Sequence, residues 1–354
     1  MKQIETNYLI CLRQTIYLLV VILVITGCNV KPEVKIVEVE AFPKEYLVKG
    51  AKTVCEELSC PHQMIVCGSV LLCVEKCNDR WLYIYDLESN RLLSRLFGHG
   101  KGPYEYPKAP WILDIWVDDS GEDYFSLADQ IRSIIYIYSV KNLLNGSLEP
   151  TKQYKLPSTI PTRTPQRLND SIWIGSAQRQ EGSLFSYNWN LKSVTNWKKR
   201  VPIDFFVDPT NRYRVNDEAM RLNNKSGVIV SSLKYLKRIY IYNSELVLTH
   251  IIRDKKAPRN PDFSKPNMAS YETVLFYEEP ILSSKYIGII NYQYTKEYQP
   301  DTELLIFDYQ GNPQEKYIFD QPFSCSAIDW ERKRLYCMSQ LDYRVMYYDL
   351  IGLE

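Results

Sequence analysis

The chain has 354 residues, 45% apolar and 24% charged, which is ordinary for a folded protein and excludes a wholly disordered one. Its 43 basic and 42 acidic residues nearly cancel, and the counts become 41 and 41 once residues 1–27 are set aside. A balanced chain has no general electrostatic attraction to DNA or RNA, so we expect no nucleic-acid partner. The 28 tyrosines favour half-buried, pleated surfaces, and composition therefore indicates a β-rich protein.

An unbroken apolar run of ten residues, Ile16–Ile25, comes first along the chain and is preceded by Lys2 and Arg13. As a helix it would be about 15 Å long, half of a bilayer core, which suits a secretory signal better than a membrane span. The run leads into Ile25-Thr26-Gly27-Cys28, which resembles the lipobox of bacterial lipoproteins. The resemblance implies cleavage before Cys28 and attachment to a membrane through acyl chains on this cysteine. An ordinary signal peptide, or an N-terminal anchor with an incidental cysteine, is the alternative.

The expected organisation is therefore a signal peptide over residues 1–27, a short tether over 28–33 and one all-β domain over 34–354. No later stretch approaches eighteen apolar residues, so we expect no membrane span after the signal.

One sequence motif recurs six times in residues 34–354: an alternating aromatic and aliphatic strand, a turn and a second short strand. The period averages about 53 residues, which suits four strands with their connections and is typical of propellers or solenoids. We predict a six-bladed β-propeller with four antiparallel strands per blade. The equivalent aromatic positions, spaced by 53, 49, 55, 65 and 41 residues, are Tyr85, Tyr138, Tyr187, Tyr242, Phe307 and Tyr348.

The sixth repeat contains only three predicted strands, at Cys325–Asp329, Lys333–Ser339 and Arg344–Asp349. At the other end of the domain, Val34–Phe42 alternates like a strand and precedes the first full repeat. We expect this N-terminal strand to complete the last blade beside Arg344–Asp349, because such closure leaves no open sheet edge there.

A glycine-rich phrase, Phe97–Pro107 (FGHGKGPYEYP), directly follows the outer strand of the first repeat. It is not a nucleotide-binding P-loop, because Lys101 is followed by glycine and no helix pattern comes after it. Glycines and a proline suit a tight crossing from one blade to the next, so we favour a structural role. The functional alternative makes His99, Lys101 and Glu105 part of a ligand-binding rim on the face of the propeller.

The phrase is similar to the FG-x-G-x-GPGEF signature of six-bladed propeller lipoproteins of Bacteroidetes, a TolB-like and NHL-like family. Tyr104 and Tyr106 replace the Gly and Phe of that signature. Together with the lipobox and the six repeats, the resemblance covers residues 28–354. The matching residues are Phe97, Gly98, Gly100, Gly102, Pro103 and Glu105.

An Asp-then-Arg pattern precedes several third strands and is similar to one in NHL-type repeats. In it, Asp would bond its own turn while Arg reaches a neighbouring blade, so we interpret the pattern as structural. The pairs are Asp79 with Arg80, Asp129 with Arg132, and Asp342 with Arg344.

Seven cysteines follow Cys28, in a compartment that permits disulfides, and the odd number leaves at least one free thiol. Their spacings lack the paired C-x2-C of zinc modules, so we expect no metal site. Cys325 and Cys337 flank a predicted turn centred on Glu331 and could face each other across two strands. Free buried thiols remain the default for these two residues.

Catalytic motifs are missing from the sequence: His62, His99 and His250 fall in different repeats or loops, and no nucleophile elbow or H-E-x-x-H is present. We therefore assign no catalytic residue, metal ligand or cofactor. We expect a non-enzymatic, lipid-anchored propeller of the outer membrane that binds a protein, peptide or glycan of the cell envelope. The segment after Cys28 (NVKPE) lacks the acidic cluster that often accompanies surface export in this phylum, which favours the periplasmic face over the cell surface.

Two other functions stay open at this point. One is a metal-dependent hydrolase or lyase acting in the propeller channel, which would need carboxylates or histidines converging on one cavity. The other is a structural subunit of an envelope assembly that docks through the polar insertions Val201–Asn216 and Asp254–Ser270. Fold class alone does not choose among them.

Overall fold

The structure is a computed structural model that describes residues 33–158, 160–161, 164–177, 183–199, 205–256, 263–266, 275–294 and 302–353. The predicted signal peptide, Cys28 and nearly all of the tether lie outside these residues, as do parts of both polar insertions. The chain divides into a small unit, Met1–Lys35, and a large unit, Ile36–Glu354, which contains the sheets. In the described part of the chain, no helix has both the length and the hydropathy needed to cross a membrane.

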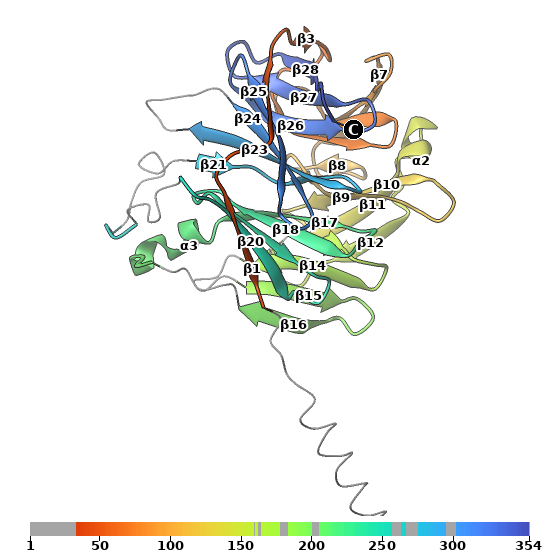
Figure 1. Cartoon of the computed structure of the whole chain (residues 1–354). Coiled ribbons are helices and arrows are strands. Elements are labelled where there is room, and N and C mark those ends of the chain that lie inside the picture. Colours follow the sequence, from red (N-terminus) through yellow and green to blue (C-terminus); the bar gives the residue numbers. More distant parts are fainter. Residues whose placement is uncertain are drawn as a thin grey trace, which may run out of the picture. The chain divides into compact units, whose positions relative to one another are not determined.

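Six sheets follow one another along the large unit as the blades of a β-propeller (Figure 1). Blade one contains β4 (Pro61–Cys67), β5 (Val70–Glu75), β6 (Arg80–Asp86), β7 (Leu92–His99) and the short parallel strand β8 (Glu105–Tyr106). Blade two contains β9 (Trp111–Val117), β10 (Asp123–Asp129), β11 (Ile134–Ser139) and β12 (Lys152–Lys155), with helix α2 (Val140–Leu144) before β12. Blade three contains β13 (Gln166–Arg167), β14 (Ile172–Ala177), β15 (Ser183–Asn188) and β16 (Ser193–Lys199).

The remaining three blades have the same plan. Blade four is preceded by η1 (Pro209–Asn211) and α3 (Arg212–Val215) and contains β17 (Glu218–Asn223), β18 (Val228–Leu233), β19 (Arg238–Tyr242) and β20 (Leu248–Asp254). Blade five contains β21 (Leu275–Tyr277), β22 (Ile281–Leu282), β23 (Tyr286–Tyr294), β24 (Glu303–Asp308) and β25 (Pro313–Phe319). Blade six contains β26 (Phe323–Asp329), β27 (Arg334–Ser339) and β28 (Val345–Asp349). The prediction of a six-bladed propeller with four-stranded blades is confirmed.

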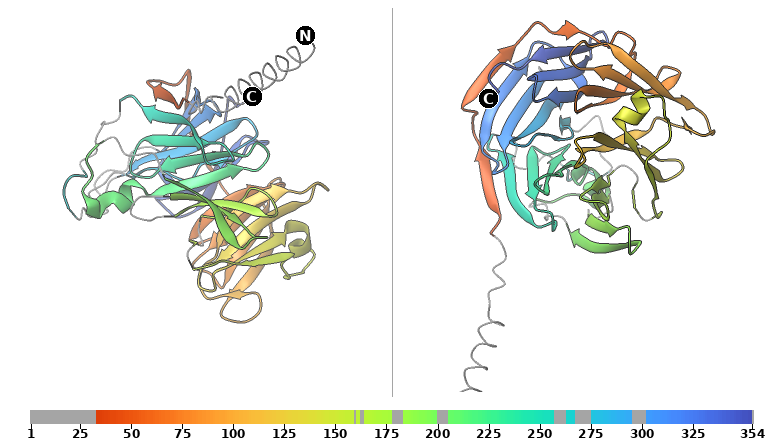
Figure 2. Two further views of the ribbon diagram at one scale, coloured as in Figure 1. Left: turned by 90° about the horizontal axis from the view of Figure 1, so that it is seen from below. Right: turned by 90° about the vertical axis from the view of Figure 1, so that its right-hand side faces the viewer.

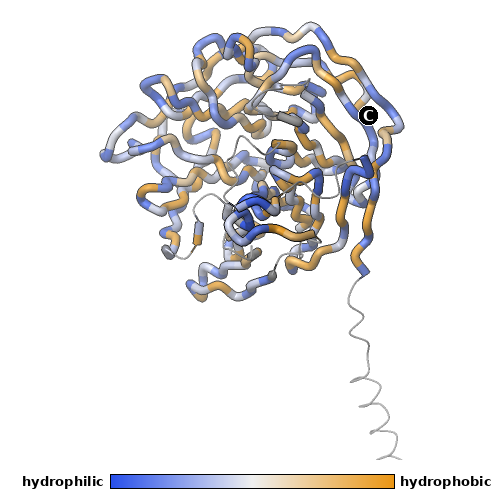
Figure 3. The backbone as a smooth tube through the Cα atoms, turned by 90° about the vertical axis from the view of Figure 1, so that its left-hand side faces the viewer, coloured by the Kyte–Doolittle hydropathy of each residue, from blue (hydrophilic) through white to orange (hydrophobic). Residues whose placement is uncertain are grey.

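The aromatic residue that marks each repeat lies on the third strand of its blade and is at most 5% exposed. Burial of each such ring contributes about 2–3 kcal/mol to folding, so the repeated aromatic position is a core position that the blades share. Hydrophobic and hydrophilic residues alternate along the strands (Figure 3), as strands that turn one side to a neighbouring blade require.

An N-terminal belt of three strands, residues 35–53, runs along the outer edges of blades four, five and six (Figure 2, right). It consists of β1 (Lys35–Val39) on β20, β2 (Lys44–Val48) on β25 and β3 (Lys52–Thr53) on β28. The predicted closure of the last blade by an N-terminal strand is therefore confirmed. The segment proposed for it was wrong, since Val34–Phe42 contains β1 and joins blade four. Alternation identifies a strand but carries no information about which distant edge accepts it.

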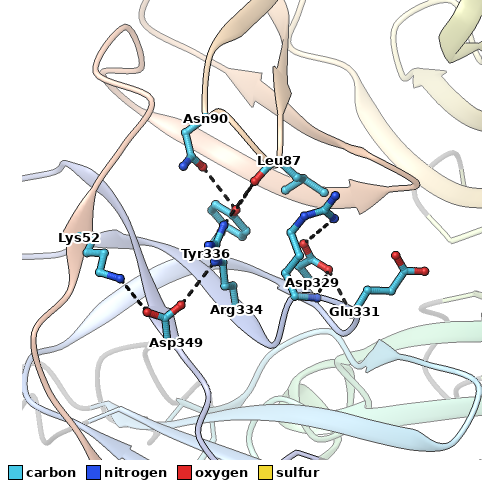
Figure 4. A network of polar contacts seen from close by, with 9 residues as sticks. Lys52, Leu87, Asn90, Asp329, Glu331, Arg334, Tyr336 and Asp349 are labelled. Carbon is cyan, nitrogen blue, oxygen red and sulfur yellow. Dashed lines mark hydrogen bonds and ion pairs between the residues drawn. The ribbon is translucent and has the colours of Figure 1, made fainter.

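Polar side chains also join the last blade to the first where the ring closes (Figure 4). The Lys52 ammonium lies 2.8 Å from the Asp349 carboxylate, which Arg334 also approaches at 3.4 Å. The Tyr336 hydroxyl donates to the Leu87 carbonyl on blade one at 3.5 Å. Side-chain contacts between blades six and one therefore supplement the very short strand β3.

Candidate functional site

The first strands of the blades surround a central cavity of about 1240 Å³, which we call the channel. Strands β4, β9, β17 and β26 supply lining residues, and blade five supplies residues 275 and 277–284. Among the described residues, blade three contributes Pro161, Thr164 and Ser176. A cavity of this volume can enclose a ligand of several residues or sugar rings, which makes the channel the candidate site.

Arg221 on β17 connects three blades across the channel. One guanidinium nitrogen donates to the Leu113 carbonyl of blade two, and the other lies 2.9 Å from the Glu279 carboxylate of blade five. Its side chain is only 12% exposed.

Asp114 on β9 is a buried carboxylate in the same wall, 4% exposed. It accepts hydrogen bonds from the Asn224 side chain at 3.1 Å and from the backbone N–H groups of Ile115 at 2.9 Å and Arg167 at 3.1 Å. Burial raises the pKa of Asp114 to about 6, against the lowering effects of Asn224, Arg221 and the two N–H donors. Asp114 therefore changes charge at a mildly acidic pH.

Two consecutive glutamates of the channel wall, Glu278 and Glu279, lie between β21 and β22. The negative charge of Glu279 repels that of Glu278. Burial raises the pKa of Glu278, and the Glu279 charge adds to the rise. The Tyr292 and Ser326 hydroxyls and the charge of Lys234 act in the opposite direction. Burial also raises the pKa of Glu279, although Arg221 and Lys234 oppose it. Among the described residues, no basic side chain lies within 4 Å of the Glu278 carboxylate, so this group alone of the two lacks an ion pair.

The lining of the channel carries more acid than base. Asp217 is paired with Lys234 at 3.1 Å, and Glu218 accepts a hydrogen bond from the Ser231 hydroxyl at 2.6 Å. In the described part of the chain, the lining contains seven acidic residues, Asp114, Asp217, Glu218, Glu278, Glu279, Asp329 and Glu331, and three basic ones, Arg221, Lys225 and Lys234. The walls therefore favour a ligand that brings positive charge or hydrogen-bond donors.

These carboxylates do not form a metal centre within the part of the chain that the structure describes. There, the one group of ligating side chains close enough to share an ion is Cys60, Glu75 and Cys77, which does not line the channel. Cys60 and Cys77 are joined by a disulfide. The Glu75 carboxylate accepts the backbone N–H groups of four residues, Ser59, Cys60, Lys76 and Cys77. The ligand atoms of this group are thus already engaged in the fold.

The disulfide Cys60–Cys77 pairs two residues for which the sequence favoured no partner. Cys325 and Cys337, considered as possible partners across two strands, are free thiols. Cys325 falls at an irregularity in the pairing of β26 with β27, between Ser324 and Ala327.

The glycine-rich crossing, Phe97–Pro107, folds back on itself. The Glu105 carboxylate accepts the Gly102 N–H at 2.9 Å, and a Cβ atom placed on Gly100 would lie 2.0 Å from that carboxylate. Arg132 of blade two donates to the carbonyls of Glu105 at 2.7 Å and Lys101 at 2.8 Å while pairing with Asp129 at 3.2 Å. Asp129 itself accepts two N–H groups of its turn, so this pair has the predicted structural geometry.

The other two predicted pairs are exposed and local: Asp79–Arg80 at 3.8 Å and Asp342–Arg344 at 3.6 Å.

The candidate rim residues are all placed in the crossing, and none is among the residues that line the channel. The His99 ring is exposed and stacks on Trp81, with ring centroids 3.6 Å apart. The Lys101 side chain is exposed, and the Glu105 side chain points back to Gly102. The crossing therefore has an evident structural role, and a ligand-binding rim at His99, Lys101 and Glu105 stays a prediction.

No protein-family model matches the sequence, and the search of curated proteins likewise found no match. A crystal structure of a member of the DUF4221 family from Bacteroides vulgatus is similar in fold, with 12% sequence identity and a TM-score of 0.52. The similarity covers 84% of this chain and 95% of that chain. At this identity it shows the fold, and membership of a propeller lipoprotein family remains a proposal.

Two further solved structures have TM-scores below 0.5. Raptor from Chaetomium thermophilum has a TM-score of 0.46 and 11% identity, covering 88% of this chain and 30% of that chain. The β-propeller domain of Cps50 (Swd1) from Myceliophteria thermophila also has a TM-score of 0.46, with 9% identity. The similarity covers 85% of this chain and 100% of that chain.

Proposed function

We propose that the protein is a lipid-anchored binding module of the cell envelope whose channel takes a peptide or glycan bearing a positively charged amine. The observation that carries the proposal is Glu278, a carboxylate in the channel wall with no basic side chain within 4 Å among the described residues. Its neighbours Asp217 and Glu279 already have basic partners. An ammonium group of a ligand would complete the missing ion pair.

Aromatic side chains in the same wall suit either kind of ligand. Trp111, Tyr235, Tyr277 and Trp330 line the channel together with Asn223 and Asn224. Flat rings stack on sugars or on apolar side chains of a peptide, while amides and carboxylates hydrogen-bond their polar groups.

Binding accounts for these residues better than hydrolysis does. A metal-dependent hydrolase would need several carboxylates or histidines around one point, whereas the described channel carboxylates are distributed over separate partners. Two carboxylates, Asp114 and Glu279, are tied into a network with Arg221 and Asn224. Such a network gives a shaped, charged wall rather than an open coordination site.

The membrane part of the proposal comes from the N-terminal sequence. Cys28 follows an apolar run and small residues, and its acylation would attach the domain to the outer membrane, with the periplasmic face favoured. The tether of residues 28–33 would keep the propeller close to the lipid surface. Docking through the insertions Val201–Asn216 and Asp254–Ser270 is the less supported alternative, and residues 201–204, 257–262 and 267–270 within them lie outside the described chain.

Four small probes test the ligand class. A lysine-containing tripeptide and a chitosan tetramer carry free amines, and the same two molecules with their amines acetylated serve as controls. We expect calorimetry to detect binding of at least one free amine, with about tenfold or greater loss on acetylation, because a half-buried carboxylate in the channel wall discriminates against an uncharged amide. Equal binding of free and acetylated forms, or no binding of either amine, would contradict the proposal.

Substitution of Glu278 gives the matched test on the protein. Glu278→Gln preserves size and should lower amine affinity by about tenfold or more, since one charge-assisted contact contributes about 1.5–3 kcal/mol. Glu56→Gln, an exposed glutamate away from the channel, is the control and should leave affinity unchanged. If both variants bind like the wild type, Glu278 is not the site of recognition.

A further inference from the structure

Three of the six blades have a further strand outside their fourth strand: β1 covers β20, β2 covers β25, and β8 covers β7 of blade one. Among the described residues, the other three blades end at their fourth strand, which is β12 in blade two, β16 in blade three and β3 in blade six. β3 has only two residues, and Lys52 on it is paired with Asp349. Because an uncovered edge strand can contact another surface, the longer edges of blades two and three are candidates for an interaction.

The belt starts on the side of blade four that faces blade three. β1 runs parallel to β20, since the ion pairs Glu38–Arg253 and Glu40–Lys255 advance in the same direction, and β2 runs parallel to β25. The belt thus proceeds from blade four through five to six, and its first residues lie at the end nearest blade three. Six residues lie between Cys28 and Lys35, and the seven steps of chain reach at most about 24 Å. An acylated Cys28 would bring lipid to this part of the ring.

The edge of blade three has the chemistry of a membrane surface contact. Trp197 on β16 is 43% exposed while packing against Phe185, and Leu191 in the β15–β16 turn is 67% exposed. Lys192 is exposed beside Leu191, and Lys198 follows Trp197. Tryptophan and lysine are the residues that settle at the boundary between lipid and water, and lysines attract anionic headgroups.

The edge of blade two lacks this combination. β12 (KQYK) has no large apolar side chain among the exposed ones. Its two lysines are engaged, Lys155 with the Arg132 carbonyl and Lys152 with Asp170 at 3.5 Å. Asp170, the exposed acid near blade three, is also paired with Arg167 at 2.5 Å, so it does not oppose an anionic surface as a free charge.

We propose that the outer edge of blade three, comprising β16 and the β15–β16 turn, rests on the lipid bilayer and contacts anionic headgroups. This inference depends on the lipid anchor of the proposed function and goes beyond it by orienting the domain. The outer edge of a blade lies at the circumference of the ring. A bilayer in contact with this edge therefore has its plane roughly parallel to the channel axis. Both mouths of the channel then stay open to ligand.

Fluorescence quenching by brominated lipids tests the contact. The full-length acylated protein is reconstituted into phosphatidylethanolamine vesicles with phosphatidylglycerol, with or without bromine on the acyl chains. Among the described tryptophans, Trp197 is the most exposed, at 43%, so we expect most of the quenching to disappear in Trp197→Phe. Trp330→Phe, on blade six across the ring, is the matched control and should leave the quenching unchanged. Equal quenching in wild type and Trp197→Phe would overturn the proposal.

Two further measurements keep the result interpretable. Replacing Lys192 and Lys198 by alanine should reduce the extra quenching that phosphatidylglycerol provides, and hydrogen exchange of residues 191–198 should be slower on vesicles than in detergent. Unchanged exchange at these residues would also overturn the proposed membrane contact.

Flotation with vesicles tests the lipid anchor separately: loss of flotation in Cys28→Ala supports the anchor. Flotation with no quenching at Trp197 rejects the orientation alone, whereas flotation that Cys28→Ala leaves unchanged rejects the anchor and the orientation together.

Discussion

The glycine-rich crossing and the channel are built in opposite ways. The crossing is held mainly by contacts within eleven consecutive residues, such as Gly102 N–H to the Glu105 carboxylate, with Arg132 added from the next blade. The channel has no local motif, and its contacts join residues as far apart as Asp114 and Asn224, 110 positions along the chain. A conspicuous sequence motif such as the glycine-rich crossing therefore marks a place where the backbone conformation requires particular residues. The recognition surface is instead assembled from single side chains on separate strands.

Removing the channel arginine should have the largest effect on stability. Arg221→Met keeps much of the side-chain volume but leaves Glu279 and the Leu113 carbonyl without their partner. The Glu279 side chain is 38% exposed, so solvent screens part of the ion pair, but the hydrogen bond to the Leu113 carbonyl is lost as well. Together these losses should cost about 2–4 kcal/mol, which denaturant unfolding measures directly. Arg344→Met is the control, because that arginine is 70% exposed beside Asp342 and its ion pair should contribute less than about 1 kcal/mol. Similar losses in the two variants would mean that the channel network does not hold the blades together.

The pH dependence of stability should report the channel through Asp114. Its pKa is raised from the ordinary 3.8 to about 6, so between about pH 4 and 6 the folded state keeps a proton that the unfolded state has lost. The free energy of unfolding contributed by this group is thus present below pH 4 and is lost as the pH rises to 6. The loss is on the order of 2–3 kcal/mol relative to Asp114→Asn.

Asp86, an aspartate in a turn, is a control because its contribution to the free energy of unfolding should change with pH in the opposite direction. Hydrogen bonds from the Ser89 hydroxyl and backbone N–H lower the pKa of Asp86, so its contribution is lost only as the pH falls below about 4. Urea unfolding of wild type, Asp114→Asn and Asp86→Asn from pH 3 to 7 separates the two windows. Parallel curves for wild type and Asp114→Asn would contradict the raised pKa.

The crossing should be most sensitive at Gly100. Its φ is +152°, and a Cβ would meet the Glu105 carboxylate that Gly102 holds, so Gly100→Ala should cost about 2 kcal/mol of unfolding free energy. Gly121→Ala is the matched control: its φ is +83°, but nothing lies within 4 Å of the added carbon. If the clash with Glu105 causes this destabilisation, Gly100→Ala should lower the free energy of unfolding by less in a protein that already carries Glu105→Ala. An unchanged cost in that background would place the strain elsewhere.

The repeated aromatic strands predicted the fold because each repeat carries its own pattern: Tyr85 and Tyr348 occupy equivalent buried positions that alternation alone reveals. The partner of Val34–Phe42 could not be predicted, since three blade edges accept similar strands and the choice depends on chain geometry far away. In the channel, Asp114 and Arg221 leave a weak signal, a charge inside the otherwise apolar strand WILDIWV and a second in EAMRLN. How the ring closes decides that these two residues meet, and also that no basic side chain among the described residues lies within 4 Å of Glu278.

The smallest expected effect on stability decides whether the crossing also binds ligand. His99→Ala removes a ring stacked on Trp81, and because the His99 side chain is exposed its loss should cost less than about 1 kcal/mol. Trp81 keeps its hydrogen bond to the Tyr106 carbonyl at 2.9 Å, so the crossing should stay in place. Lys101→Ala should be nearly silent for stability, because the Lys101 carbonyl and not its side chain holds Arg132. Calorimetry with the free-amine probe then separates the two regions. Weaker binding in either variant, with a normal unfolding curve, would extend the binding surface from the channel to the predicted rim. Unchanged binding in both would leave the crossing as a structural device and the channel as the whole of the site.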